Sequence, residues 1–170
     1  MDLAKMIRDI PDFPKEGILF RDITTLLKDK EGFHEAVSRI AKSLEGYDVD
    51  LVVGPEARGF IFGSPVAYAI GAGLILARKP GKLPAESMSV TYGLEYGADS
   101  LAIHTDSIKP GARIAVVDDL LATGGTAKAV CELCEKMGGK VVALRFLIEL
   151  SDLKGKETLA GYDVQTLISY

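Results

Sequence analysis

The chain has 170 residues, a length typical of one domain, and 48% of them are hydrophobic, which is enough for a substantial core. The formal net charge of −4, from 20 basic and 24 acidic side chains, argues against a nucleic-acid surface, which usually needs a basic excess. This balance still permits a small anion to be bound by a few local positive charges.

The N-terminal stretch 1–14 lacks the apolar core of a signal peptide. The uncharged stretch 60–77 is long enough to suggest a membrane span, but Gly63, Pro65 and Gly71 interrupt it. A helix followed by a buried strand explains this stretch better. We therefore expect a cytoplasmic protein without a membrane partner.

Hydrophobic spacing predicts the elements of the first half of the chain. A helix over 3–10 ends at Pro11, and an irregular segment follows. Pro65 is tolerable in the third predicted helix if it falls in the first turn. The predicted elements after the irregular segment are an amphipathic helix over 33–44, a buried strand at 49–54, a helix within 59–71 and a strand at 74–77.

The second half begins with a polar, glycine-rich segment at 79–105, which predicts a projecting β-ribbon or mobile loop. The elements expected after it are a strand at 113–117, a helix at 126–137, a strand at 141–150, a short helix near 152–160 and a strand at 163–168. Apolar strands that alternate with helices predict an α/β fold with a mostly parallel, five-stranded sheet flanked by helices. Ligands bind such sheets beyond the carboxyl ends of the strands. The segments 55–59, 78–82 and 118–126 all follow predicted strands, so we expect them to converge.

Two cysteines, Cys131 and Cys134, lie in the middle of a predicted helix. A redox pair normally lies at a helix N-terminus, and a zinc site is not indicated, because there is no second cysteine pair and His34 and His104 are the only histidines. Core packing is the preferred interpretation of both cysteines.

The segment 114–130 runs from an apolar strand through two adjacent aspartates to a short turn that opens a helix. Free backbone N–H groups and the positive end of the helix dipole make such a turn a phosphate cradle. Glycines permit close approach of the backbone to the anion, and threonines add hydroxyl donors. The spacing matches neither a Walker A loop nor a dinucleotide fingerprint. The turn consists of Ala122, Thr123, Gly124, Gly125 and Thr126.

Asp118 and Asp119 complete this pattern. Carboxylates only accept hydrogen bonds, and two adjacent ones can accept from the neighbouring hydroxyls of a sugar. The segment therefore suits a ribose 5-phosphate. The alternative is a structural role, in which the acids cap the turn and the glycines only make it tight.

The segment "DDLLATGGTA" at 118–127 resembles the phosphoribosyl pyrophosphate signature of the type I phosphoribosyltransferases. Most of the chain resembles the adenine-specific branch of that family, whereas 30–50 and the residues after 150 are less diagnostic. Four further matching segments occur in order, at 11–29, 56–63, 78–84 and 94–97.

This resemblance implies a single domain over 1–170. Its N-terminal arm at 1–30 would form a hood over the base, and 79–103 would be a flexible catalytic lid. The implied reaction is purine salvage, in which adenine and 5-phosphoribosyl 1-pyrophosphate (PRPP) give AMP and pyrophosphate. The resemblance also implies a homodimer and a Mg²⁺ ion held mainly by PRPP and water, without ligands from protein side chains.

The resemblance also implies residue roles. Arg58, Lys79 and Tyr96 would contact pyrophosphate, and Glu95 would handle the proton on adenine. Arg58 is also expected to contribute to catalysis through its charge. A strained peptide bond is implied near Glu56–Ala57. For Arg58 and Glu95, the alternative is a solvated loop side chain.

The base would be bound by the segment "ILFRD". Leu19 would offer a backbone C=O and N–H to the adenine edge, and Phe20 and Arg21 would close the pocket. For Phe20, ordinary core packing is an equal alternative. The roles of Arg78 and Lys82 stay open.

Two other functions remain possible on the sequence. The first is a 6-oxopurine or xanthine phosphoribosyltransferase with the same sugar site. The second is a regulator that senses PRPP without turnover, although the chain shows no basic face or added nucleic-acid-binding domain.

Overall fold

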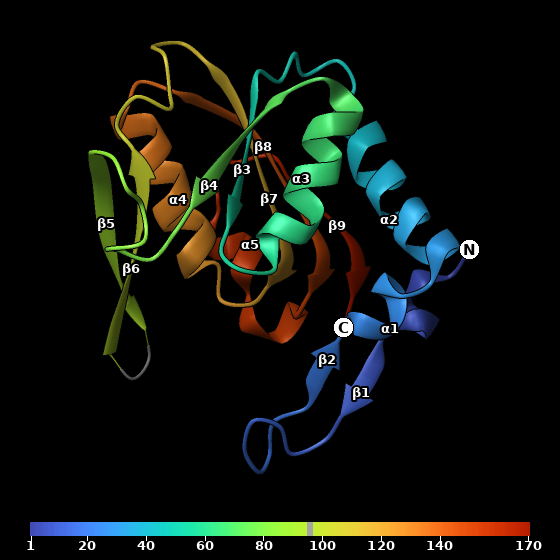
Figure 1. Cartoon of the computed structure of the whole chain (residues 1–170). Helices are drawn as coiled ribbons and strands as arrows, with labels where there is room; N and C mark the ends of the chain where they lie inside the picture. Colours follow the sequence, from blue (N-terminus) through green and yellow to red (C-terminus); the bar gives the residue numbers. More distant parts are fainter. Residues whose placement is uncertain (95–96) are drawn as a thin grey trace.

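The computed structural model of the protein describes residues 1–94 and 97–170. Its centre is a five-stranded sheet in the order β4-β3-β7-β8-β9, and every pair in it is parallel. Figure 1 shows helices on both sides of this sheet. The predicted α/β fold class is confirmed. The strands are β3 (Leu51–Pro55), β4 (Gly73–Ala77), β7 (Arg113–Leu121), β8 (Lys140–Glu149) and β9 (Val164–Ser169).

Two hydrophobic clusters lie on the two faces of the sheet. One cluster joins β3 and β7 to α4 (Gly125–Lys136), and the other joins the sheet to α2 (Lys30–Lys42) and α3 (Gly59–Ile70). Alternate residues of β7 face opposite clusters, and Ile114 to Val117 are all fully buried. A strand covered on both faces explains the continuous apolar run in the sequence. None of the helices in the described part of the chain combines the length and the hydropathy needed to span a bilayer.

The N-terminal segment differs from the predicted helix over 3–10. A 3-10 helix covers only Leu3–Met6, capped by the Asp2 side chain, and the next residues form strand β1 (Arg8–Ile10). This strand pairs antiparallel with β2 (Phe20–Asp22), which precedes α1 (Thr24–Leu27). Cross-strand ion pairs, Arg8–Asp22 and Arg21–Asp9, stabilise the ribbon and override the helical spacing.

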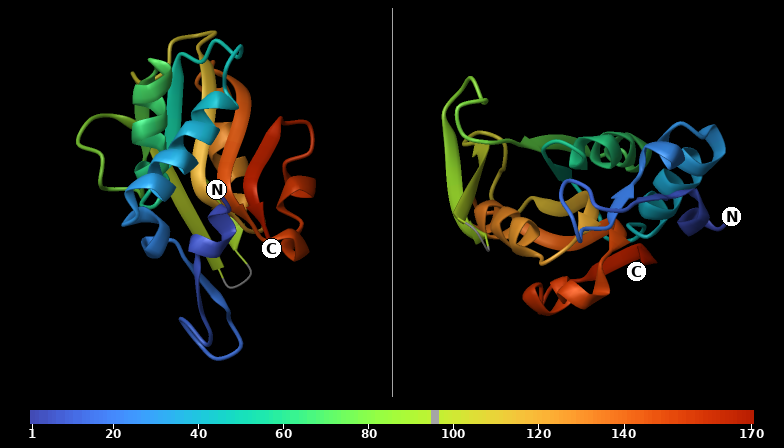
Figure 2. Two further views of the ribbon diagram at one scale, coloured as in Figure 1. Left: turned by 90° about the vertical axis from the view of Figure 1, so that its right-hand side faces the viewer. Right: turned by 90° about the horizontal axis from the view of Figure 1, so that it is seen from below.

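The segment 79–105 contains the predicted β-ribbon. Strands β5 (Ser87–Leu94) and β6 (Gly97–His104) form an antiparallel pair that packs against α4. A bridge between Arg78 and Ala102 joins β6 to the chain just after β4. Seen from below in Figure 2, this ribbon stands beside α4, whereas the N-terminal ribbon passes in front of the end of the sheet.

Three details of the prediction are corrected. Pro65 lies in the interior of α3 rather than in its first turn. Strand β7 does not stop at the aspartates but continues to Leu121, because the neighbouring strand β8 pairs with it up to Glu149. The expected short helix consists of two pieces, η2 (Ser151–Leu153) and α5 (Gly155–Thr158).

The structure confirms the prediction that both cysteines pack in the core. Cys131 and Cys134 are free thiols with no exposed surface on the buried face of α4. Burial is the main cause that raises the pKa of both thiols, that of Cys134 to about 12. Neither thiol has the low pKa that marks a reactive cysteine.

Candidate active site

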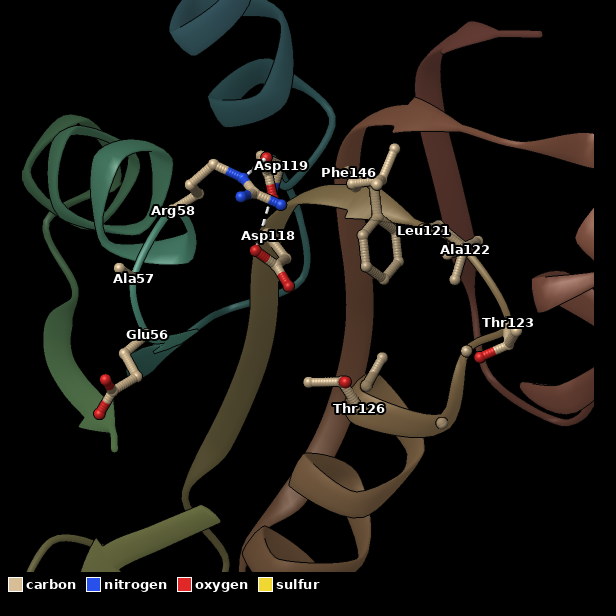
Figure 3. A pocket seen from close by; sticks show the side chains of 14 residues that line it. Glu56, Ala57, Arg58, Asp118, Asp119, Leu121, Ala122, Thr123, Thr126 and Phe146 are labelled. Carbon is tan, nitrogen blue, oxygen red and sulfur yellow. Dashed lines mark hydrogen bonds and ion pairs between the residues drawn. The ribbon is translucent and has the colours of Figure 1, made fainter. Parts of the chain in front are cut away.

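A cavity of about 270 Å³ opens at the carboxyl ends of β3 and β7. It is lined by the turn 56–58, by Phe146 of β8 and by 118–127 (Figure 3). Two of the three segments that were expected to converge therefore line one cavity. In Figure 3 the aspartates and Arg58 lie on one side and the turn 122–126 on the other, with the Phe146 ring between them.

The two aspartates differ in their surroundings although they are adjacent. Asp118 Oδ1 accepts a hydrogen bond from the backbone N–H of Asp119 at 2.8 Å, and Asp119 Oδ2 accepts one from Arg58 Nε at 2.5 Å. Asp119 is only 5% exposed. Burial, and then the charge of Asp119, raise the pKa of Asp118 well above its usual value. Of the two aspartates, Asp119 has a cation, Arg58, in direct contact, and Asp118 shows no such partner among the described residues.

The close approach of Asp118 to α3 depends on a glycine. A Cβ atom at Gly59 would lie 3.0 Å from Asp118 Oδ1 and 2.6 Å from Pro55 Cδ. Only glycine leaves room for the carboxylate against the first residue of α3. The peptide bond between Glu56 and Ala57, in the same turn, is cis. The resemblance implied an unusual backbone at this position.

Within the turn 122–126, Gly124 adopts φ +86° as the N-cap of α4, and Gly125 and Thr126 form the start of that helix. The first N–H groups of a helix have no partner inside it and are open to an anion. A second glycine supports the turn from behind, since a Cβ atom at Gly155 of α5 would lie 2.5 Å from the carbonyl oxygen of Ala122. Helix α5 therefore packs directly against the backbone of the turn.

The basic side chains near the cavity pair with carboxylates of the protein. Arg58 pairs with Asp119 as described above, and Lys79 Nζ lies 3.2 Å from Asp99 Oδ2 of β6. Both basic side chains remain half exposed, so an anion could reach them. Two further basic residues, Arg78 and Lys82, lie at Glu56.

A second cavity of about 140 Å³ lies under the N-terminal ribbon and shares Arg58 and Asp119 with the first cavity. The predicted base-binding residues Leu19, Phe20 and Arg21 all line it, and Leu19 is 46% exposed. Among the described residues, neither core cluster includes Phe20. The ring of Phe20 instead packs edge-on against that of Phe13 at 5.1 Å. Ordinary core packing therefore does not account for Phe20.

Arg21 is held in place by the ribbon and by the end of the chain. Its guanidinium pairs with Asp9 and lies 3.7 Å from the centre of the Tyr170 ring. These contacts leave its side chain only 18% exposed. Arg21 therefore lines the wall of the cavity in a fixed position.

Glu95 and Tyr96, predicted for proton transfer and pyrophosphate, lie outside the described residues. Within the described ranges, no three acidic, histidine or cysteine side chains come together as a metal cluster. Sequence reasoning gave no role to the side chains of Phe146 and Glu56 or to Gly155. The sequence did offer a signal for Glu56, because it lies between a predicted strand and Arg58, a predicted site residue.

Comparison with known proteins assigns the class. Residues 24–167 match the family model of the phosphoribosyl transferase domain. The chain belongs to the phosphoribosyltransferase family and is an enzyme that transfers a pentosyl group. It is 62% identical to an adenine phosphoribosyltransferase of Clostridium beijerinckii, over the whole chain and 99% of that relative. Within the family it groups with the adenine phosphoribosyltransferases.

Solved structures agree with this assignment. The crystal structure of the adenine phosphoribosyltransferase of Thermoanaerobacter pseudethanolicus is 53% identical, with a TM-score of 0.96 over 99% of this chain and 98% of that chain. The Giardia lamblia enzyme, crystallised with 9-deazaadenine, is 33% identical, with a TM-score of 0.94 over 99% of this chain and 96% of that one. The family resemblance found in the sequence is confirmed.

Proposed function

We propose that the protein is a purine salvage enzyme that converts adenine and PRPP to AMP and pyrophosphate. The observation that carries this proposal is the junction of the two cavities at Arg58 and Asp119. The first cavity is lined by the acid pair, Asp118 and Asp119, and by the turn 122–126, which we call the phosphate turn. The second cavity lies under the N-terminal ribbon, the hood, and is lined by Phe20. A base and a phosphorylated ribose placed in them would meet at this junction.

The donor is held at three points. Its ribose hydroxyls donate to Asp118 and Asp119, and its 5-phosphate accepts from the turn, which comprises Ala122, Thr123, Gly124, Gly125 and Thr126. The pyrophosphate end lies against Arg58 and Lys79, whose half-exposed side chains support this role. These contacts position the anomeric carbon C1 of the ribose between the base and the leaving group.

The base lies under the hood, with its edge on the backbone C=O and N–H of Leu19. A carbonyl at this place accepts from the amino group of adenine and repels the oxygen of a 6-oxopurine. Phe20 and Arg21 close the pocket. The half-exposed position of Leu19 in the cavity wall supports this arrangement.

The reaction breaks the bond from C1 to pyrophosphate and forms the bond from C1 to adenine N9. Positive charge builds on the sugar and negative charge on the leaving group, so positioning and electrostatics supply most of the catalysis. Arg58 and Lys79 stabilise the leaving group. Glu95 handles the proton of adenine at N7 or N9, and Tyr96 covers the pyrophosphate or the sugar. The lid, residues 79–103, closes over the site and excludes water.

The proposal includes Mg²⁺, a homodimer and a cytoplasmic location. Mg²⁺ would be held mainly by PRPP oxygens and water, without ligands from protein side chains. When bound, Mg²⁺ would neutralise charge on the pyrophosphate. The free thiols of Cys131 and Cys134 are consistent with a reducing compartment.

The test is turnover with PRPP, Mg²⁺ and one free purine at a time. We expect AMP from adenine and little or no nucleotide from hypoxanthine, guanine or xanthine. A preference for a 6-oxopurine would contradict the assignment of the base. Tight PRPP binding without any turnover would favour a sensor instead of an enzyme.

A further inference from the structure

One acidic side chain near the first cavity is almost buried and has several basic partners. The Glu56 side chain is 10% exposed. Its Oε1 accepts a hydrogen bond from the backbone N–H of Lys79 at 2.6 Å, and its Oε2 accepts one from Lys82 Nζ at 2.8 Å. Arg78 Nε lies 3.5 Å from Oε1. One carboxylate thus holds a loop that contains three basic residues.

These contacts join two segments that are far apart in the sequence. Glu56 follows β3 and lies two residues before Arg58, whereas 78–82 follows β4. The backbone N–H of Glu56 also donates to the carbonyl of Ala77 at 2.9 Å, which strengthens the same junction. The spacing between Arg58 and Lys79, the two proposed pyrophosphate contacts, is therefore set at Glu56.

We propose that Glu56 is a positioning residue for the pyrophosphate site. It does not touch the ligand but fixes the loop 78–82 against the turn that contains Arg58. This inference rests on the proposed function, because it takes pyrophosphate as the ligand of these basic residues. Its effect is confined to the pyrophosphate end of the donor, so the hood and the phosphate turn do not depend on it.

A carboxylate near a site for anions could also compete with the ligand, but the geometry of Glu56 favours positioning. Both of its oxygens are occupied by donors from the loop, and in Figure 3 its carboxyl group points away from Arg58 and from the two aspartates. Its contact with Lys82, followed by the backbone N–H of Lys79, lowers its pKa, so it is ionised at neutral pH.

Asp99 provides the contrast. Its Oδ2 pairs with the ammonium group of Lys79 at 3.2 Å, its Oδ1 accepts from the backbone N–H of Ser100 at 2.8 Å, and its side chain is 30% exposed. Solvent-exposed ion pairs of this kind are weak and exchange readily. Lys79 can therefore exchange Asp99 for a phosphate oxygen while its backbone N–H remains on Glu56.

The experiment compares Glu56→Gln with the unchanged protein. The amide oxygen of glutamine can still accept from the N–H of Lys79, but the charge that holds Lys82 and Arg78 is lost. We expect the Kd for pyrophosphate and the KM for PRPP to rise about tenfold, a change of the size given by one charge-assisted contact. The KM for adenine should stay within about twofold, because the base cavity does not include Glu56.

Two further variants separate positioning from general damage to the fold. Glu35→Gln removes another ion pair, with Arg39 of α2 at 2.7 Å, and should leave all three constants unchanged. Lys82→Met should weaken pyrophosphate binding as Glu56→Gln does, and the double variant should be no worse than either single one. If Glu56→Gln does not fold, Lys82→Met still tests the contact.

Each result decides the proposal. The positioning role would be overturned if Glu56→Gln bound pyrophosphate as tightly as the unchanged protein or more tightly. If Glu56→Gln does not fold, the same result with Lys82→Met would overturn it. Calorimetry with pyrophosphate alone measures this without adenine or turnover. An unchanged protein that binds pyrophosphate but makes no AMP would contradict the proposed function, and the comparison of variants would still be valid.

Discussion

Replacing Gly155 by alanine should damage PRPP binding although this residue lies behind the site and does not line the cavity. Gly155 is the first residue of α5, and the backbone of the phosphate turn packs directly on it. The added Cβ atom would lie 2.5 Å from the carbonyl oxygen of Ala122 and 2.7 Å from Leu121 Cδ1. The Leu121 side chain is fully buried and its Cγ would also lie within 2.8 Å, and the carbonyl oxygen belongs to the turn itself.

The size of the effect follows from this contact. The 2.5 Å separation is about 0.9 Å shorter than the 3.4 Å at which ordinary contact begins, so the turn or α5 must move by nearly that amount. Overpacking of this kind costs about 1–3 kcal/mol of folding free energy. A displacement near 1 Å in a group that positions the substrate can reduce the rate by about 100-fold. We expect kcat/KM for PRPP to fall about 10- to 100-fold.

The assay measures initial rates over a range of PRPP concentrations, together with the unfolding free energy from urea titration. Gly63→Ala is the matched control, because its Cβ atom would meet Gly54 Cα at an ordinary 3.6 Å inside helix α3. This control should keep its activity and gain up to about 1 kcal/mol, since alanine is the better helix former. A Gly155→Ala protein with unchanged kcat/KM for PRPP would show that α5 does not position the turn.

Three further predictions concern side chains of known surroundings. Asp119→Asn should weaken PRPP binding about 10- to 100-fold in calorimetry, because a charged acceptor for the ribose is lost, and unchanged affinity would remove the ribose assignment. The same change should bring the pKa of Asp118 closer to its usual value, because the charge of Asp119 helps to raise it. Asp22→Asn should lower the unfolding free energy by about 1–3 kcal/mol at pH 7. The partners of Asp22 lower its pKa from 3.8 to about 2, so the stabilisation is complete above pH 4 and decreases as the pH falls towards 2. An Asp22→Asn deficit that is equal at pH 7 and at pH 3 would contradict this assignment. Cys131 and Cys134 should not react with a thiol reagent at pH 8 until denaturant is added, and rapid reaction of the native protein would contradict their burial.

The central strands β3, β4 and β7 could be predicted because each of them has an unbroken apolar run. Residues Ile114 to Val117 are buried on both faces of β7, and no polar residue interrupts this apolar run, which is typical of a buried parallel strand. The end of β7 was predicted too early, since two charged residues normally mark the end of a buried run. The backbone pairing of β7 with β8 continues beyond Asp118 to Leu121. The hydropathy of the side chains does not indicate backbone pairing of this kind.

The N-terminal ribbon shows a different limit. Spacing within 3–10 is helical, but the competing structure depends on contacts with residues 20–22. An ion pair between Arg8 and Asp22 links positions that are 14 residues apart. The hydrophobic periodicity of a short segment carries no information about such a contact. The same limit applies to Gly155, whose requirement for glycine comes from a turn more than thirty residues earlier in the chain.

The ion pairs around the first cavity also determine how PRPP would bind. Arg58 pairs with Asp119, and Lys79 pairs with Asp99. On the proposed binding mode, the ribose hydroxyls take over Asp119 while the pyrophosphate takes over Arg58. The two ends of one PRPP molecule thus replace the two partners of a single ion pair, Arg58–Asp119. The free energy needed to separate this ion pair is therefore spent once for both contacts. A ligand that has only one of these ends leaves either Asp119, which is almost fully buried, or Arg58 without its partner. The intact donor should therefore bind more tightly than the separate affinities of ribose 5-phosphate and pyrophosphate would suggest.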